Sequence, residues 1–354
     1  MKNRIFNSIT ILGASIIMYA ILAVLMYTEI LDEYNGQLLT LAGIYVIISL
    51  SLNLMTGFTG QLVLGQAGFM CIGAYSSAIA IMTFHVPLFF AIIIGGVITA
   101  LFGFLIGFPA LRLRGDYLAI TTLGFGEIVR VVMVNLKSLT GGAAGLKGVP
   151  SFSNTGNFIT DDIIKFTWVF GFVVISLLII TNLMRSSHGR AIISIREDEI
   201  AANSMGVDTA YYKIFSFTIA AFIAGLGGGL YAAYFGYLNP VMFGFMNSAN
   251  FVVIVVLGGL GSVTGTIIAA IGFTYAQEWM RVFQDFRMVI FGLALILVML
   301  FWQKGIMGSK EFSIVGFARD LLAGRYSIKR IISKISKLIK KWKEKKQPDD
   351  RGVK

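Results

Sequence analysis

The sequence predicts an all-α protein that crosses a membrane about ten times. Three observations carry this prediction: a mean hydropathy of +0.81, hydrophobic residues at 56% of positions, and apolar runs that recur along the chain. Each run of about twenty residues would span roughly 30 Å as a helix, which is the thickness of a bilayer core. A soluble globular domain carries a smaller apolar fraction.

Hydropathy predicts nine apolar segments. The first follows MKNR, is too long for the apolar part of a typical signal peptide, and meets no small-residue cleavage pattern before Glu29, so we expect a retained span. The segments are 7–28, 36–55, 60–83, 87–108, 117–136, 163–184, 211–234, 249–276 and 286–303.

Basic residues in the short loops orient these segments, because such loops stay in the cytoplasm. All of them fall on one side of the arrangement, which is therefore predicted to be cytoplasmic. They are Lys2, Arg4, Arg112, Arg114, Arg185, Arg190 and Arg196. The glycine-rich loop 137–162 and the acids Asp161 and Asp162 are then external.

Nine crossings would put the C-terminus on the wrong side. From Gln303 onward, fifteen Lys and Arg stand against five Asp and Glu, and such a basic tail belongs inside. The eighth segment is too long for one straight crossing and contains Gly259, Gly261 and Gly265. We therefore expect a break between Gly259 and Gly265, ten segments in total, and both termini in the cytoplasm.

The predicted organisation is a transmembrane domain, 1–308, followed by a basic cytoplasmic tail, 309–354. Isoleucines and leucines in SIKRIISKISKLIKKWKEKK recur every three or four positions, which is typical of a helix lying among lipid headgroups. A disordered basic tail is the alternative. Because the net charge of +11 is concentrated in this tail, it concerns topology and lipids and indicates no nucleic-acid partner.

Motifs for enzymatic chemistry are missing from the sequence. It contains no phosphate-binding loop of the type GxxxxGK[ST] and no nucleophile elbow, so we expect neither an enzyme nor an ATPase. His85, His188 and Cys71 cannot complete a zinc site, and no metal or other cofactor is expected on this chain.

Two polar patterns inside apolar segments are candidates for a translocation path. Glu127 and Arg130 lie three positions apart and can neutralise each other on one helix face, as a path-lining pair or as a structural bridge. This scarcity of membrane charge disfavours an ion-coupled carrier. In NLMTGFTGQLVLGQAGF, polar residues alternate with glycines, which indicates a broken membrane helix or a tight turn before a closely packed helix. The residues singled out there are Asn53, Gly57, Gly60, Gln61 and Gln66.

Residues 188–208, HGRAIISIREDEIAANSMGVD, concentrate charge in the longest predicted cytoplasmic loop, 185–210. Glu197, Asp198 and Glu199 lie where a helix running to Met205 would begin, favourably placed against its dipole, and Gly206 lies where it would end. Ile192, Ile195 and Ile200 supply apolar faces, while Arg190 and Arg196 can pair with acids of a partner. An ordinary solvated loop is the alternative.

Five stretches together resemble one transporter family. They are SLNLMTGFTGQLVLGQAGFMCIGAYSSA, LRLRGDYLAITTLGFGEIVRVV, LTGGAAGLKGV, HGRAIISIREDEIAANSMGVD and VVLGGLGSVTGTIIAA, in this order along the chain. With these five stretches, the chain resembles the M-type permease subunits of branched-chain amino-acid ABC importers. Permeases for urea and short amides have a similar pattern.

The resemblance implies an ABC importer permease fold in the cytoplasmic membrane of a prokaryote. It implies a second, similar permease subunit, two cytoplasmic ATPase subunits that hold ATP and magnesium, and an extracytoplasmic solute-binding protein that delivers leucine, isoleucine or valine. Residues 188–208 would then couple the permease to the ATPases through Arg190, Ile195, Arg196, Glu197, Asp198, Glu199 and Gly206.

Overall fold

The computed structural model describes residues 2–28, 32–110, 113, 115–152, 158–281, 292 and 305. Contacts divide the chain into Met1–Glu311 and Phe312–Lys354, and every described residue belongs to the first unit. The predicted span 286–303, except for Gly292, and the predicted tail 309–354, which lacks a described residue, therefore lie outside the described residues.

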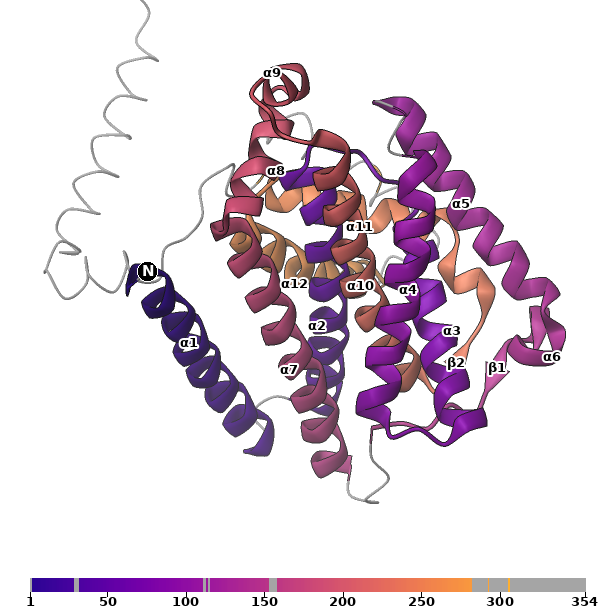
Figure 1. Cartoon of the computed structure of the whole chain (residues 1–354). Helices are drawn as coiled ribbons and strands as arrows, with labels where there is room; N and C mark the ends of the chain where they lie inside the picture. The colour runs from indigo at the N-terminus through magenta and orange to yellow at the C-terminus, as the bar shows by residue number, and fades with distance from the viewer. Residues whose placement is uncertain are drawn as a thin grey trace, which may run out of the picture. The chain divides into compact units, whose positions relative to one another are not determined.

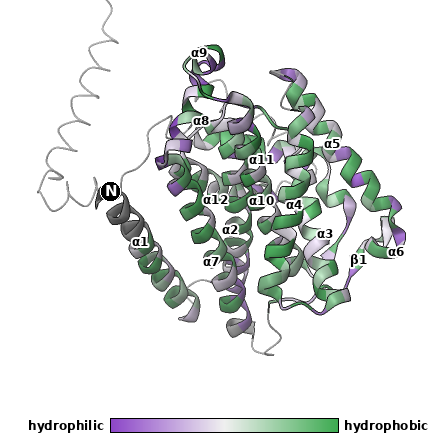
Figure 2. Ribbon diagram, in the orientation of Figure 1, coloured by the Kyte–Doolittle hydropathy of each residue, from purple (hydrophilic) through white to green (hydrophobic). Residues whose placement is uncertain are grey.

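Long apolar helices make up most of the described chain (Figure 1). Among the described residues, seven helical segments are long and apolar enough to cross a membrane, and Figure 2 shows hydrophobic residues along the long helices. The long helices are α1 (Lys2–Tyr27), α2 (Glu33–Asn53), α3 (Gln66–Phe84), α4 (Leu88–Ala110), α5 (Asp116–Asn135), α7 (Phe158–Arg185), α10 (Thr209–Phe235), α11 (Phe245–Gly258) and α12 (Val263–Trp279).

Short elements connect these helices. They are the π-helix η1 (Leu54–Phe58), α6 (Lys137–Thr140), η2 (Gly142–Ala144), β1 (Leu146–Lys147), α8 (Ser187–Glu197), α9 (Glu199–Ser204), β2 (Tyr237–Leu238) and η3 (Pro240–Phe243). The two strands pair antiparallel, with Leu146 opposite Leu238. Apart from this pair the described elements are helical, so the predicted all-α polytopic fold is confirmed.

Helix α10 lies at the centre of the described bundle and packs against α2, α3 and α4. Glycines let these backbones approach closely. A Cβ at Gly73 of α3 would collide with the backbone of Gly225 in α10, and a Cβ at Gly225 would collide with Thr99 of α4. Large apolar side chains such as Phe217 and Tyr75 fill the remaining space and are 1% or less exposed.

The described bundle has two ends of different composition. At one, the α8–α9 end, α2 and α7 finish, α5 and α10 begin, and the charged segment 188–208 lies between α7 and α10. At the other, the β1–β2 end, α2 and α7 begin, and α5 and α10 finish. Figure 2 shows hydrophilic residues on α8 and α9.

Helix α2 leads into α3 through an interrupted segment. The π-helix η1 prolongs α2, and residues 60–65 then form neither helix nor strand before α3 begins at Gln66. Val63 and Gly65 are buried, and the Leu64 N–H donates to Thr122 Oγ1 of α5 at 3.1 Å. The prediction of one span over 60–83 was therefore wrong for its first six residues. Irregular backbone at such a place is stable only because other helices enclose it.

The predicted break in segment 249–276 is confirmed. Helix α11 ends at Gly258, α12 begins at Val263, and the turn between them contains Gly259 with φ +105° and Gly261 with φ +82°. Both angles belong to the region that favours glycine. Ser262 then caps α12 by accepting a hydrogen bond from the Gly265 N–H at 3.1 Å.

Candidate functional site

Helix α8 is an amphipathic helix at the α8–α9 end. Its cap is Ser186, whose hydroxyl accepts from the Gly189 N–H at 3.2 Å. Ile192 and Ile195 are 0% and 5% exposed and face the bundle, whereas Ile193 is 39% exposed. Burial of two isoleucines fixes α8 against α7 and α10.

Helix α9 forms a separate short helix behind a break at Asp198. The Asp198 carboxylate caps it by accepting from the N–H groups of Ile200 and Ala201, at 2.8 and 3.0 Å. Gly206, with φ +84°, follows its end. The helix predicted to run from the acids to Met205 thus exists, but Glu197 is the last residue of α8 and takes no part in it.

An ion pair between a buried lysine and a half-buried glutamate holds α9 to the start of α10. Lys213 Nζ lies 2.7 Å from Glu199 Oε1, and the two side chains are 7% and 27% exposed. The amine is thereby neutralised at a position where its side chain is 7% exposed. Glu199 therefore faces the helix bundle of this chain.

The outer surface of α9 carries apolar side chains. Ile200 is 69% exposed and Met205 is 84% exposed. Glu197, Asp198 and Arg190 lie exposed on the same loop. The loop thus presents two apolar side chains among charges, which is the composition of a protein contact.

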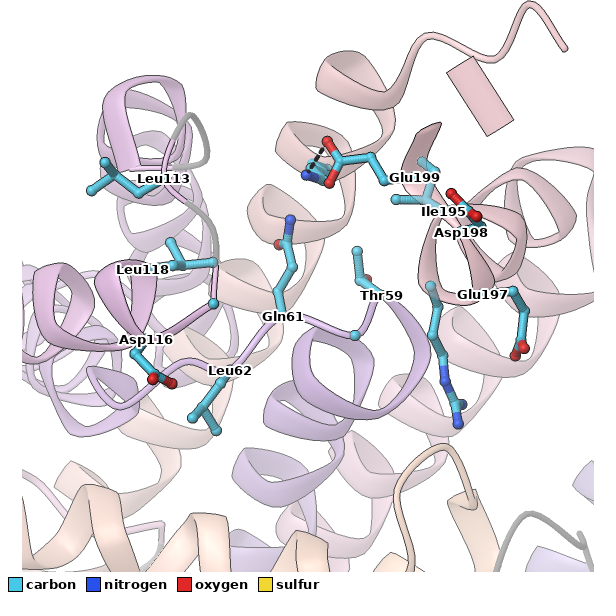
Figure 3. A pocket seen from close by; sticks show the side chains of 14 residues that line it. Thr59, Gln61, Leu62, Leu113, Asp116, Leu118, Ile195, Glu197, Asp198 and Glu199 are labelled. Atoms are coloured by element: carbon cyan, nitrogen blue, oxygen red, sulfur yellow. Dashed lines mark ion pairs between the residues drawn. The ribbon is translucent and has the colours of Figure 1, made fainter. Parts of the chain in front are cut away.

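A pocket of roughly 320 Å³ lies beside these helices, between the 59–62 segment, the start of α5 and the α8–α9 break (Figure 3). Gln61 is 7% exposed, and its Oε1 has no hydrogen-bond partner among the described residues. Figure 3 shows the Gln61 side chain between the elements that carry Asp116 and Glu199. The lining is Thr59, Gly60, Gln61, Leu62, Leu113, Gly115, Asp116, Leu118, Ile195, Arg196, Glu197, Asp198, Glu199 and Lys213.

Arg196, near the end of α8, connects that helix to both breaks. Its Nη1 donates to the Gly57 carbonyl of η1 at 2.7 Å. The same Nη1 would lie 2.7 Å from a Cβ at Gly261, so the guanidinium also lies against the α11–α12 turn. The predicted partner for Arg196 was an acid on another protein, whereas this guanidinium is engaged within the chain.

Asn53, fully buried at the end of α2, completes this group. Its Oδ1 accepts from the Gly261 N–H at 2.9 Å, and its Nδ2 donates to the Ser262 carbonyl at 3.0 Å. We call Asn53, Gly57, Arg196, Gly261 and Ser262 the Arg196 junction. The first four are separate candidates in the sequence, and the fold brings them together.

Gln66 belongs to a second buried polar group, deeper in the bundle. Its Nε2 donates to the Ile48 carbonyl at 3.1 Å and to Ser51 Oγ at 3.0 Å. Ser51 in turn donates to the Ala220 carbonyl of α10 at 2.6 Å. This chain ties the start of α3 to α2 and α10, as a polar side chain in a membrane span requires.

Glu127 and Arg130 lie apart from the Arg196 junction, on α5. Arg130 Nε lies 2.7 Å from Glu127 Oε2, and the side chains are 31% and 35% exposed. Glu127 Oε1 also accepts from the Phe245 N–H at 3.2 Å, which caps the first turn of α11. The pair therefore lies within α5, and the Glu127 carboxylate bridges to α11.

Other predicted residues have structural surroundings. Gly60 has φ +75° and lies against the side chain of Arg196, whose Cγ would be 3.1 Å from a Cβ there. His188 packs against the rings of Tyr212 and Phe215. Cys71 is buried. Within the described part of the chain, no group of three or more His, Cys, Asp or Glu could hold a metal ion.

Four residues that contact the predicted site segments were not predicted from the sequence, namely Lys213, Ser262, Thr122 and Ser248. Lys213 carried a signal, since it is a lysine inside the predicted span 211–234. Ser248 accepts from the Ala67 N–H at 2.9 Å. The sequence around Ser248 does not indicate that its partner lies 181 positions away.

Helices that break within the apolar bundle, with polar side chains paired at the breaks, are typical of membrane transport proteins. Comparison with known proteins identifies the kind. Residues 34–299 match the family described as "Branched-chain amino acid transport system / permease component", and the chain belongs to that family. The resemblance to M-type permeases is confirmed, and the chain is a multi-pass transport permease subunit.

Three relatives illustrate the breadth of the family. The high-affinity branched-chain amino acid transport permease LivM of Escherichia coli is 40% identical over 76% of this chain and 68% of its own length. LivH of Salmonella typhimurium is 26% identical over 78% and 95%. A probable LivM of Methanocaldococcus jannaschii is 23% identical over 76% and 91%. No solved structure matches the chain.

Proposed function

We propose that this chain imports branched-chain amino acids as one membrane subunit of an ATP-driven transporter. Its α8–α9 end faces the cytoplasm and docks a separate ATPase subunit. The observation that carries the proposal is the outer surface of α9, where Ile200 and Met205 are exposed while the Lys213–Glu199 pair fixes the helix to α10. A rigid element with an apolar tip can both bind a partner and transmit its movement.

The remaining subunits follow from the family. LivH relatives that match this chain are themselves permeases, which supports pairing with a second permease of similar sequence. Two ATPases bearing ATP and magnesium dock at the α8–α9 end, and a solute-binding protein delivers leucine, isoleucine or valine at the β1–β2 end. This orientation puts the basic loop residues in the cytoplasm, together with both termini and the tail, whose lysines attract anionic lipids.

The docking step is tested by replacing both exposed apolar residues, Ile200→Asp and Met205→Asp, in the complex expressed with its ATPases. An ATPase that docks on this surface no longer co-purifies with the double variant. Leu139→Asp is the matched control, because Leu139 is 52% exposed on α6 at the opposite end. Retention of the ATPase by the double variant would exclude the α9 surface as its docking site.

Cargo is tested by uptake into vesicles that contain the complete complex. Leucine, isoleucine and valine, each with ATP inside, should accumulate and compete with one another. Urea and a short amide serve as the comparison. If these accumulate in preference to leucine, the transporter belongs with the permeases for urea and short amides.

A further inference from the structure

The Arg196 junction joins three elements that are distant in sequence. Arg196 lies on α8, Gly57 lies 139 positions away in η1, and Gly261 lies in the turn between α11 and α12. Both partners of Arg196 are therefore helix breaks. The Arg196 side chain thus links α8 to both breaks.

The Gly57 carbonyl is a strong acceptor for a guanidinium. Within the break, the carbonyls of Leu54 and Met55 accept from the N–H groups of Thr59 and Gln61, at 3.2 and 3.0 Å. The Gly57 carbonyl has its Arg196 bond instead. Carbonyls at the end of a helix carry partial negative charge, so a cation stabilises the break.

Close approach at the junction depends on two glycines. A Cβ on Gly57 would collide with Asn53 Oδ1 and with the backbone nitrogen of Gly261. Gly261 has φ +82°, and a side chain there would press on Arg196. The two breaks thus touch backbone to backbone, with Asn53 clamping one side and Arg196 the other.

Other charged groups of the loop do not make this connection. Arg190 is exposed, and its guanidinium donates at 3.5 Å to the carbonyl of Ser186, the residue that caps the same helix. Glu199 joins α9 to α10 through Lys213. Among the described charged side chains of residues 188–208, Arg196 is the one that bonds to η1.

We propose that Arg196 is a positioning residue that links α8 to the two helix breaks, so that ATP-driven displacement of α8 changes the conformation of both breaks. The inference rests on the proposed function, because it needs an ATPase to move α8. It assigns the transmission step to one guanidinium and two glycines.

The first test compares Arg196→Gln, Arg196→Lys and wild type in the complete complex in proteoliposomes. Loss of a charged hydrogen bond should lower leucine taken up per ATP hydrolysed by about tenfold or more in Arg196→Gln, with assembly retained. Arg196→Lys keeps a donor and the charge, so its ratio of leucine taken up to ATP hydrolysed should lie between those of wild type and Arg196→Gln. The control is Arg281→Gln, whose ratio should equal that of wild type. Arg281 is exposed, lies just beyond the end of α12, and is paired with Glu278.

The second test follows backbone hydrogen exchange in segments 55–61 and 257–263, with and without trapped ATP. The amides of Thr59, Gln61 and Gly261 are bonded at the breaks and report on them. In wild type, ATP should change exchange in α8 and in both segments. In Arg196→Gln the change should persist in α8 and disappear from the breaks, which simple loosening of the fold would not produce.

Two failures remain distinguishable. A wild-type complex without binding-protein-stimulated ATPase activity or uptake would refute the proposed function. A working complex in which Arg196→Gln transports as much leucine per ATP as wild type, or keeps the ATP-dependent change at both breaks, would overturn the role of Arg196 alone.

Discussion

Asn53 illustrates how one buried amide can replace a stretch of secondary structure. Both of its polar atoms are bonded to the α11–α12 turn: Oδ1 accepts from the Gly261 N–H, and Nδ2 donates to the Ser262 carbonyl, which also accepts from Thr266 of α12. Inside an apolar bundle each unpaired group is expensive. The side chain of Asn53 is therefore part of the turn, although it lies more than two hundred positions earlier in the chain.

Replacing Asn53 by alanine should lower the thermal stability of the purified protein markedly. The Gly261 N–H loses its partner, at a cost of about 1–3 kcal/mol, while the Ser262 carbonyl keeps its bonds from Thr266. Asn135→Ala is the control, because Asn135 is exposed and bonds to the Val131 carbonyl of its own helix. Equal melting temperatures for the two variants would show that water or another group replaces the Asn53 amide.

Glu127 should stabilise the start of α11 through its carboxylate oxygen. Glu127→Ala removes the cap on the Phe245 N–H, which costs about 0.5–2 kcal/mol and raises local exchange roughly 2- to 30-fold. Glu127→Gln keeps an acceptor at the same place and should exchange more slowly than the alanine variant. Hydrogen exchange of residues 245–248 measures this, and identical rates in both variants would contradict the cap.

At the scale of elements, the α11–α12 turn depends on glycine at one position and not at another. Gly261→Ala should destabilise the protein by about 1–3 kcal/mol, because φ is +82° there and the new methyl group would press on Arg196. Gly272→Ala lies in the middle of α12 with open space around it, and should be neutral or stabilising by up to about 1 kcal/mol. Thermal melts of the two variants give the comparison. Equal destabilisation would mean that the turn relaxes to accept a side chain.

Hydropathy was sufficient to predict the long helices, because burial in a bilayer and burial in this bundle demand the same apolar residues. The ends of α4, α5 and α10 fall within two residues of the predicted segments 87–108, 117–136 and 211–234. Length and charge balance together also predicted the break at Gly259. These are local or additive properties of the sequence.

The parts of the site that could not be predicted depend on contacts between distant segments. The division into α8 and α9 follows from the extended conformation of Asp198, with φ −158°, whose carboxylate caps the second helix. The sequence shows a cluster of acids there, and such a cluster fits the start of one helix as well as the junction of two. Likewise, the pairing of Arg196 with a backbone carbonyl leaves no trace in sequence, since any residue supplies a carbonyl.

At the scale of the whole molecule, the loop between α7 and α10 is richer in arginine than the loop between α5 and α7. The α8–α9 end carries Arg185, Arg190 and Arg196, whereas Asp161 and Asp162 open α7 at the β1–β2 end. Loops with Lys and Arg resist translocation across the membrane, whereas acidic residues have little influence on the orientation. Sidedness is therefore a property of the summed loops and of no single residue.

This asymmetry predicts which end a membrane-impermeant reagent reaches. Cys71, the single cysteine of the chain, is fully buried, so engineered thiols can be labelled selectively. Ser204→Cys at the end of α9 should react with an impermeant maleimide only in inside-out vesicles, and Lys147→Cys in β1 only in intact cells. Both positions are exposed, so access to the aqueous phase is the variable. Labelling of Ser204→Cys in intact cells would invert the orientation, and with it the side on which the ATPases dock.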